Sequence, residues 1–186
     1  MAQQPVPVFN FHVYFSPLAA ENLQLGGGDV VATAVSLTGG TVSSANGIGF
    51  AEVSGLNAEL DVEEYREGGR NIGPRRFPRW GRYPNLVFRR GVTRSTDLWR
   101  WWADVITHSF TLAATGIQPV PRRNGVILLE AQDHTAVAGW FFANALPERL
   151  IGPGLSARGN DIAIETLELS HEGLLRLPDT NLPAPV

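Results

Sequence analysis

The stretch VSGLNAELDVEEYREGGRNIGPRRFPRWGRYPNLVFRRG, from Val53 to Gly91, decides the fold because it joins two strand-like segments through a long segment crowded with opposite charges. Its first part alternates apolar and polar residues, the period-2 pattern of a strand with one face on the core and the other on water or a partner. The apolar face holds Leu56, Ala58, Leu60 and Val62, and the polar face holds Asn57, Glu59, Asp61 and Glu63. Gly68 and Gly69 then allow backbone angles that other residues avoid, so we expect a turn there.

Prolines, arginines and aromatic residues fill the rest of the stretch. Pro74, Pro78 and Pro84 exclude a continuous helix. Between them lies an arginine–aromatic belt, composed of Arg75, Arg76, Phe77, Arg79, Trp80, Arg82 and Tyr83. Binding of single-stranded nucleic acid uses the same side chains, but the neighbouring carboxylates favour arginine–carboxylate pairs across a joint between subunits.

The remaining pattern predicts a mainly β (α+β) fold. Alternation predicts a half-buried strand over residues 8–15, a hairpin formed by 125–132 and 136–145, and a last strand over 161–171. A helix is predicted over residues 93–109, where Ser95 or Thr96 is available as N-cap and Trp99 lies off the apolar stripe. The stripe consists of Leu98, Trp101, Trp102, Val105 and Ile106. We therefore expect two packed antiparallel sheets, or an open barrel, with one amphipathic helix on one side.

Length favours one domain over residues 1–186, because 186 residues with 44% hydrophobic content suffice for a single core. A glycine-rich segment at about 16–48 is predicted to be an insertion, either a long loop or an exposed hairpin. A proline-rich segment at about 174–186 is predicted to be a C-terminal arm.

Composition argues against several kinds of enzyme. All 15 basic residues are arginine, so the chain lacks a lysine for Schiff-base or phosphate-loop chemistry, and it has no cysteine for a nucleophile, a disulfide or a thiolate metal site. The net charge of −3 also disfavours a generally basic nucleic-acid-binding protein. We expect no catalytic residue, no cofactor and no metal.

Short motifs do not change that expectation. His12, His108, His134 and His171 are scattered and lack the spacing of metal ligands. Asp133 and His134 are adjacent, but no GxSxG motif supplies a nucleophile. The segment GPGLSA at 152–157 fits a dinucleotide-binding pattern by letter only, since a proline interrupts it and no βαβ unit surrounds it.

The N-terminal residues MAQQPVPVFNF lack the features of a signal peptide, and no apolar run is long enough to span a bilayer. We therefore expect synthesis in the cytoplasm and no membrane insertion before any assembly.

The ordered motifs of the chain resemble the tail-tube proteins of contractile phages and the inner-tube proteins of contractile injection systems. The resemblance rests on SGL at 54–56, EYREGG at 64–69 followed by Asn71, NL at 85–86, Phe88 and RG at 90–91. It continues through Trp102, WFFANALPER at 140–149 and IETLELSHEG at 164–173, and it includes the opening strand FNFHVYF at 9–15.

The resemblance implies a structural subunit without a chemical step. In the family, six subunits close into a β-barrel ring, rings stack into a tube, and the tube lies inside a sheath above a baseplate. DNA or effector protein passes through the lumen, and the finished particle is a phage tail or an injection particle. Matched position by position, the resemblance implies inter-subunit contacts at Glu63, Glu64, Tyr65, Arg66, Glu67, Gly68, Gly69, Arg70, Asn71, Arg89, Arg90 and Gly91.

Three alternatives remain open on the sequence. The glycine-rich insertion favours a tube-initiating or baseplate-proximal paralogue, because a ring at the end of a tube meets a different partner on one side. From another class, a soluble β-barrel that binds a small ligand or glycan predicts a monomer with an apolar pocket. A small hydrolase is a third hypothesis, which the missing nucleophile motif disfavours.

Overall fold

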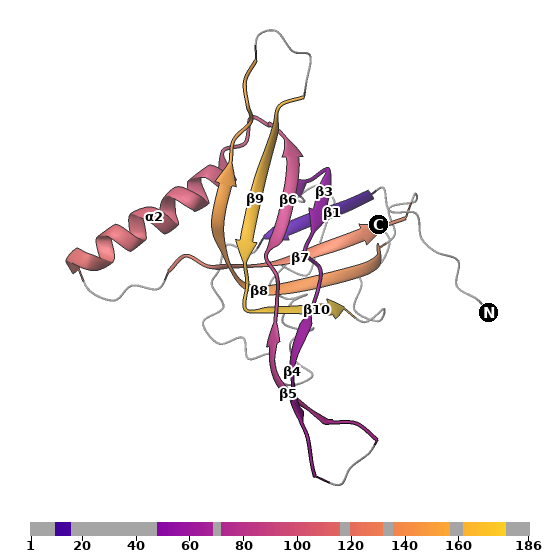
Figure 1. Ribbon diagram of the computed structural model, residues 1–186. Coiled ribbons are helices and arrows are strands. Elements are labelled where there is room, and N and C mark those ends of the chain that lie inside the picture. The colour runs from indigo at the N-terminus through magenta and orange to yellow at the C-terminus, as the bar shows by residue number, and fades with distance from the viewer. Residues whose placement is uncertain are drawn as a thin grey trace.

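The computed structural model describes residues 10–15, 48–68, 72–115, 120–131, 136–156 and 162–177. Within these ranges, strands dominate and one long helix lies against them (Figure 1). The elements are β1 (Asn10–Phe15), β2 (Ile48–Gly49), β3 (Glu52–Ser54), β4 (Glu59–Tyr65), β5 (Arg75–Arg82), β6 (Leu86–Gly91), α2 (Asp97–Thr115), β7 (Arg123–Glu130), β8 (Ala136–Ile151), β9 (Ile164–Ser170) and β10 (Gly173–Leu177).

The long strand β8 belongs to two antiparallel sheets. Its first half pairs with β7 on one side and β10 on the other, and β7 leads on to β1 and β2. Its second half pairs with β9, which leads on to β6 and β3. Apart from the β4–β5 hairpin, the described strands therefore form two open sheets that share strand β8, which confirms the expected fold class. The alternative of a closed ligand-binding barrel is left without support.

The bend in β8 lies at Asn144, whose φ of 52° is in the left-handed region that asparagine tolerates better than most residues. Polar groups hold this corner. The Asn144 N–H donates to Oδ1 of Asn124 at 2.7 Å, and its carbonyl accepts from Nη1 of Arg122 at 3.0 Å. Its side-chain amide donates to Glu172 at 2.9 Å, so the corner ties β8 to the turn between β9 and β10.

The main core lies between the two sheets and under α2. The helix inserts Leu98, Trp101 and Val105 among the buried side chains of both sheets, as its apolar stripe predicts. Trp101 also donates from its indole nitrogen to the carbonyl of Pro121 at 2.8 Å. The helix starts later than predicted, because Ser95 Oγ accepts the N–H of Asp97 at 3.3 Å and fixes the first turn there. It also extends to Thr115, beyond the predicted end at residue 109.

Strand β1 contributes a buried side chain to each of two cores, one on each of its faces. Val13 packs in the main core, as alternation predicts. Tyr14, on the opposite face, packs in a second cluster with Val126 and Phe141. The alternation of β1 thus places side chains in two cores, whereas a half-buried strand was predicted.

The hairpin formed by β4 and β5 projects away from the two sheets (Figure 1). Leu56, just before it, packs against the main core, but Leu60 is 59% exposed and Val62 is 43% exposed. The prediction that Leu60 and Val62 face the core is therefore wrong. Pro78 is accommodated within β5 because a two-stranded ribbon leaves one edge of each strand unpaired.

Two of the predicted segments are described only in part. Residues 16–47 of the predicted insertion lie outside the described residues, and Ile48 and Gly49 form the short strand β2. Of the predicted C-terminal arm, residues up to Leu177 belong to β10, where Leu177 is buried, and residues 178–186 lie outside the described residues. No helix among the described residues is long and apolar enough to cross a membrane.

Candidate subunit interface on the protruding hairpin

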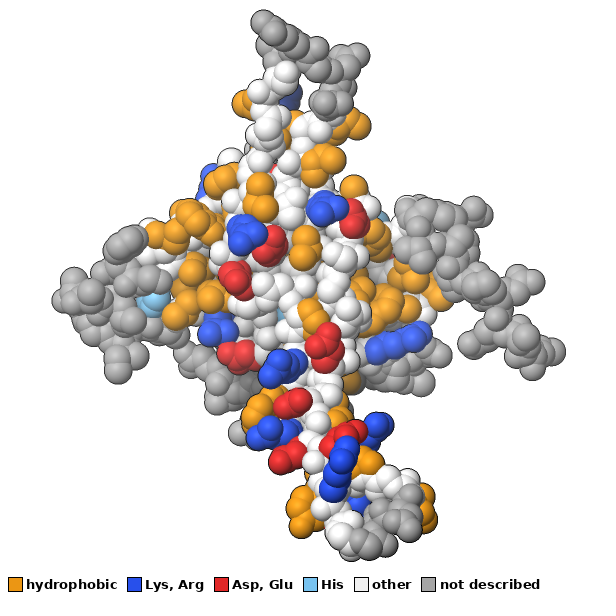
Figure 2. Space-filling model, viewed as in Figure 1, with side chains coloured by type: hydrophobic (Ala, Val, Ile, Leu, Met, Phe, Trp, Pro, Cys, Tyr) orange, Lys and Arg blue, Asp and Glu red, His pale blue; other side chains and the backbone are white. Residues whose placement is uncertain are grey.

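Ion pairs cross the hairpin from one strand to the other. Antiparallel pairing places Glu64 opposite Arg76, and these side chains form an ion pair at 3.1 Å. Two further pairs join the same arms of the chain, Glu67 with Arg75 at 3.1 Å and Glu63 with Arg79 at 3.6 Å. Figure 2 shows acidic and basic side chains interleaved along this hairpin.

These pairs change the expected role of the charges. The sequence predicted pairs across subunits, whereas each of the three carboxylates has an arginine partner within its own hairpin. Exposed pairs of this kind contribute roughly 0–1 kcal/mol each. The charges therefore set the register of the two strands and leave the hairpin locally close to neutral.

Apolar side chains occupy the rest of the hairpin surface. Leu60 and Val62 share one face, and Tyr65 and Phe77 share the other, by the register of the two strands. All four are exposed, as is Trp80, over which the Arg79 guanidinium lies 4.5 Å from the ring centroid. A two-stranded ribbon is marginally stable alone, and large exposed apolar side chains mark sites of association.

The root of the hairpin is fixed to the sheets. Gly55, in the SGL motif, has φ of 90°, and a side chain there would collide with the Asn85 carbonyl. The Asn85 side chain donates to Glu148 of β8 at 2.6 Å. His171 contacts the Pro84 carbonyl at 3.1 Å. The hairpin is thus a rigidly rooted projection, which suits a contact surface.

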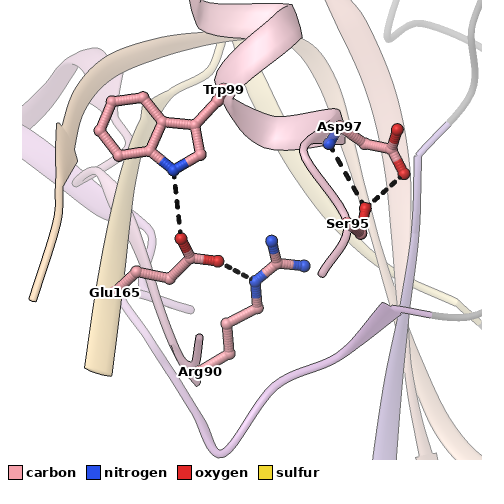
Figure 3. A network of polar contacts seen from close by, with 5 residues as sticks. All are labelled: Arg90, Ser95, Asp97, Trp99 and Glu165. Atoms are coloured by element: carbon pink, nitrogen blue, oxygen red, sulfur yellow. Dashed lines mark hydrogen bonds and ion pairs between the residues drawn. The ribbon is translucent and has the colours of Figure 1, made fainter. Parts of the chain in front are cut away.

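The predicted residues Arg89, Arg90 and Gly91 lie in β6, and they differ in exposure. Arg89 is exposed and pairs with Glu52 of β3 at 3.1 Å. Arg90 is buried and pairs with Glu165 of β9, which also accepts from the indole nitrogen of Trp99 at 3.3 Å (Figure 3). Arg90 therefore stabilises the subunit interior, and its predicted place in an inter-subunit contact does not fit its burial.

The remaining predicted residues lie around the hairpin turn. Arg66 and Gly68 are exposed there, whereas Gly69, Arg70 and Asn71 lie outside the described residues. The structure thus brings Glu63 to Gly68 together on one projection, and Arg89 lies apart from it in β6.

Most of the chain matches a known protein family. Residues 8–175 match the family described as T4-like virus tail tube protein gp19. This chain belongs to that tail tube family. The family is structural, and the chain is a structural subunit of a tube. No protein with a curated description matches the chain.

Solved structures of contractile machines contain chains with the same fold. One, in the baseplate of the anti-feeding prophage (sixfold symmetrised), has 24% identity and a TM-score of 0.68 over 95% of this chain and 97% of that one. Another, in the sheath–tube complex of the extracellular contractile injection system PVC, has 23% identity and a TM-score of 0.61 over 92% and 90%. A third, from the PVC sheath/tube terminator, has 23% identity and a TM-score of 0.65 over 96% and 100%.

Sequence reasoning missed a second exposed apolar surface on this tail tube family member. It lies at the end opposite the hairpin, where β8 leads to β9 (Figure 1). We call it the apical patch, and it consists of Val92, Trp99, Ile151, Leu155, Ile162 and Ile164. One signal was available, because Trp99 lies off the apolar stripe of its helix.

Proposed function

We propose that this tube subunit closes into rings of six and that the rings stack around a continuous lumen, with the β4–β5 hairpin as the principal contact between subunits. The observation that carries the proposal is a rooted hairpin whose apolar side chains are exposed on both faces. A similar chain in a baseplate structure that was sixfold symmetrised supports the number six.

Burial of the hairpin against a neighbour supplies the driving force. Burying apolar surface contributes roughly 25 cal/mol per Å², and the paired charges enter the contact without an unmatched partner. The contact surface comprises Glu63, Glu64, Tyr65, Arg66, Glu67 and Gly68, with Gly69, Arg70 and Asn71 proposed on sequence alone. Arg89 and Gly91 extend it to β6, whose neighbour β3 is an end strand of the described sheet. Ring closure protects such edges from uncontrolled pairing.

The proposed partners follow from the family. A sheath surrounds the tube, a baseplate meets one end, and DNA or an effector protein passes through the lumen. The subunit is made in the cytoplasm and becomes part of a phage tail or an injection particle. Similar chains in sheath–tube and baseplate structures support these partners.

Negative-stain electron microscopy of the purified protein over a range of concentrations tests the proposal. We expect rings or hollow tubes for the natural sequence. Replacement of Leu60 and Val62 by serine abolishes them while the subunit stays folded, because both side chains are exposed in the single chain. The matched control is Arg149→Gln in β8, away from the hairpin, which removes one ion pair of an exposed arginine with Glu168 and leaves assembly intact.

The outcomes separate the remaining alternatives. Rings that never stack support the tube-end paralogue, since a ring at a tube end needs a different partner on one side. Compact monomers at every concentration contradict the proposal. Unchanged tubes from the Leu60 and Val62 double variant contradict the placement of the contact on the hairpin.

A further inference from the structure

Two exposed apolar surfaces lie at opposite ends of the subunit. The β4–β5 hairpin projects from one end, and the apical patch lies at the other end, where β8 leads to β9 (Figure 1). Figure 2 shows apolar side chains at both ends. On the hairpin, Leu60 and Val62 are exposed, and on the patch, Leu155 and Ile162 are 88% and 80% exposed. Exposed apolar surfaces mark sites of association, so both ends call for a partner.

Three segments of the chain converge to form the apical patch. The N–H of Val92 donates to the carbonyl of Ala163 at 2.9 Å, which joins the end of β6 to the segment before β9. The Trp99 ring lies against Gly152, where an added methyl group would be 3.7 Å from the ring. The indole nitrogen of Trp99 donates to the buried Glu165 at 3.3 Å (Figure 3). The patch thus presents an exposed tryptophan whose orientation is already fixed.

A tryptophan held in this way is well suited to anchor a contact. The Trp99 ring is 42% exposed, although its indole N–H is satisfied within the subunit. Because the ring is oriented before a partner arrives, association costs little further side-chain entropy. Tryptophan is also enriched among the few residues that dominate binding energy at protein interfaces.

The charges at the two ends are complementary. Beside the patch, Arg94 and Arg100 are exposed, and neither has an ion-pair partner among the described residues. The nearby carboxylate of Asp97 already accepts from the hydroxyl that caps its own helix. On β4, Glu59 and Asp61 likewise have no ion-pair partner in the described part of the chain. Two unpaired carboxylates on the hairpin therefore match two unpaired guanidinium groups beside the patch.

The same comparison selects one side of the hairpin. Two hairpin arginines also have no ion-pair partner within the described ranges, and they are Arg66, which follows β4, and Arg82, which ends β5. Like charges oppose contact, so β5 is the less favourable side to approach the patch arginines. Strand β4 carries the unpaired carboxylates together with Leu60 and Val62. The β4 side is therefore complementary to the patch in both charge and apolar character.

We propose that the apical patch of one subunit receives the β4 side of the hairpin of a second copy, so that subunits of successive rings join head to tail. This inference rests on the proposed function, because it takes the hairpin as a contact surface. The two surfaces differ and lie at opposite ends, so the contact is heterologous. Any assembly then has free hairpins at one end and free patches at the other. The tube grows with one polarity, and its two ends need chemically different partners.

Thiol cross-linking maps the contact, because the chain has no cysteine of its own. Val62→Cys places a thiol on the hairpin, and Leu155→Cys places one on the patch, both at exposed positions. Each single variant is purified alone, and the two are also produced together so that both enter the same assemblies. A short bis-maleimide reagent joins neighbouring thiols, and denaturing gel electrophoresis separates the products. Circular dichroism verifies that each variant is folded.

Head-to-tail contact gives a distinct set of products. Each single variant alone stays monomeric, the two together give dimers, and a chain with both substitutions gives a ladder of dimers, trimers and longer products. The matched control is Ala103→Cys, exposed on α2 outside both surfaces, which gives little dimer with Val62→Cys. Trp99→Ser, added to the Leu155→Cys chain, lowers the dimer yield about tenfold or more, as expected for truncation of an anchoring tryptophan.

Like-with-like products overturn the inference, since dimers from Val62→Cys alone or from Leu155→Cys alone place identical surfaces in contact. Equal cross-linking of Val62→Cys to Ala103→Cys overturns it as well. Electron microscopy of the same samples keeps the two proposals apart. Tubes that lack the product of Val62→Cys with Leu155→Cys contradict the patch contact and leave the proposed assembly intact. Ladders without rings support the patch contact and contradict the proposed ring.

Discussion

The buried ion pair between Arg90 and Glu165 gives a sharp stability prediction. Their side chains are 4% and 5% exposed, and the second carboxylate oxygen of Glu165 accepts from Trp99 (Figure 3). Glu165→Ala leaves the Arg90 guanidinium buried without its carboxylate. Removing one member of a buried pair lowers the free energy of unfolding by about 3–5 kcal/mol. In a domain of this size, that corresponds to a fall in melting temperature of roughly 6–20 °C.

The chain supplies a matched control one residue away. Arg89 pairs with Glu52 between side chains that are 52% and 55% exposed. Glu52→Ala therefore changes the free energy of unfolding by only about 0–1 kcal/mol. The paired replacement of Arg90 by Met and Glu165 by Leu removes both buried charges, so it recovers most of the stability that Glu165→Ala loses.

Urea unfolding, followed by far-ultraviolet circular dichroism, measures the three variants. Protein concentrations must be low enough to keep the subunit unassembled, because assembly raises apparent stability. The decisive quantity is the difference between Glu165→Ala and Glu52→Ala. A loss below about 1 kcal/mol for Glu165→Ala would refute the reasoning, because it would place the Arg90 pair in the range of exposed pairs.

Two further predictions concern β1 and β7. Gly125→Ala places a methyl group against the Phe142 ring and 2.7 Å from the Tyr14 carbonyl oxygen, so it lowers the free energy of unfolding by about 1–3 kcal/mol and lowers the melting temperature. The control Gly154→Ala places its methyl group in open space and has little effect on the melting temperature. Burial and the charge of Glu130 raise the pKa of Tyr14 from 10.0 to about 12. The native state therefore holds the phenol proton more tightly than the unfolded state, and the free energy of unfolding falls as the pH rises from about 10 to about 12. Tyr14→Phe removes this alkaline loss in urea unfolding, and an unchanged pH dependence would contradict it.

Regular patterns made much of the fold predictable. The apolar stripe of α2 follows the helical period, and three of its five members, Leu98, Trp101 and Val105, pack in the main core. The hairpin of β7 and β8 was predicted from two apolar segments that flank a polar turn. The bend in β8 was not predicted, because it depends on Asn144, whose partners Asn124 and Glu172 are distant in sequence.

The hairpin of β4 and β5 shows where alternation stops being informative. Leu60 and Val62 alternate with charges as they would on a core-facing strand, yet both are exposed in the single chain. Alternation reports that one face is apolar, but it does not report whether that face meets the core or a neighbouring subunit. The segment was predicted to be a joint between subunits from its charges, and in the structure three of its carboxylates pair with arginines of the same hairpin.

Arg90 could have been assigned correctly from the sequence. It lies two residues after Phe88 in the same strand, so both side chains point to one face. Phe88 is a large apolar residue and is expected in the core, so Arg90 must also point inward. A buried arginine requires a carboxylate partner. The alternation of side chains along a strand thus predicts that Arg89 is exposed and Arg90 is buried, although both residues are arginine.

The two kinds of arginine pair suit different tasks. The Arg90 pair is enclosed by the subunit and holds β6 to β9. The hairpin pairs, such as Glu64 with Arg76, are satisfied before any neighbour arrives. Burying an unpaired charge in a contact is strongly unfavourable, whereas burying a charge that already has its partner is much less so. A hairpin with three internal ion pairs and exposed apolar side chains therefore needs no complementary charge from a neighbour at those paired positions.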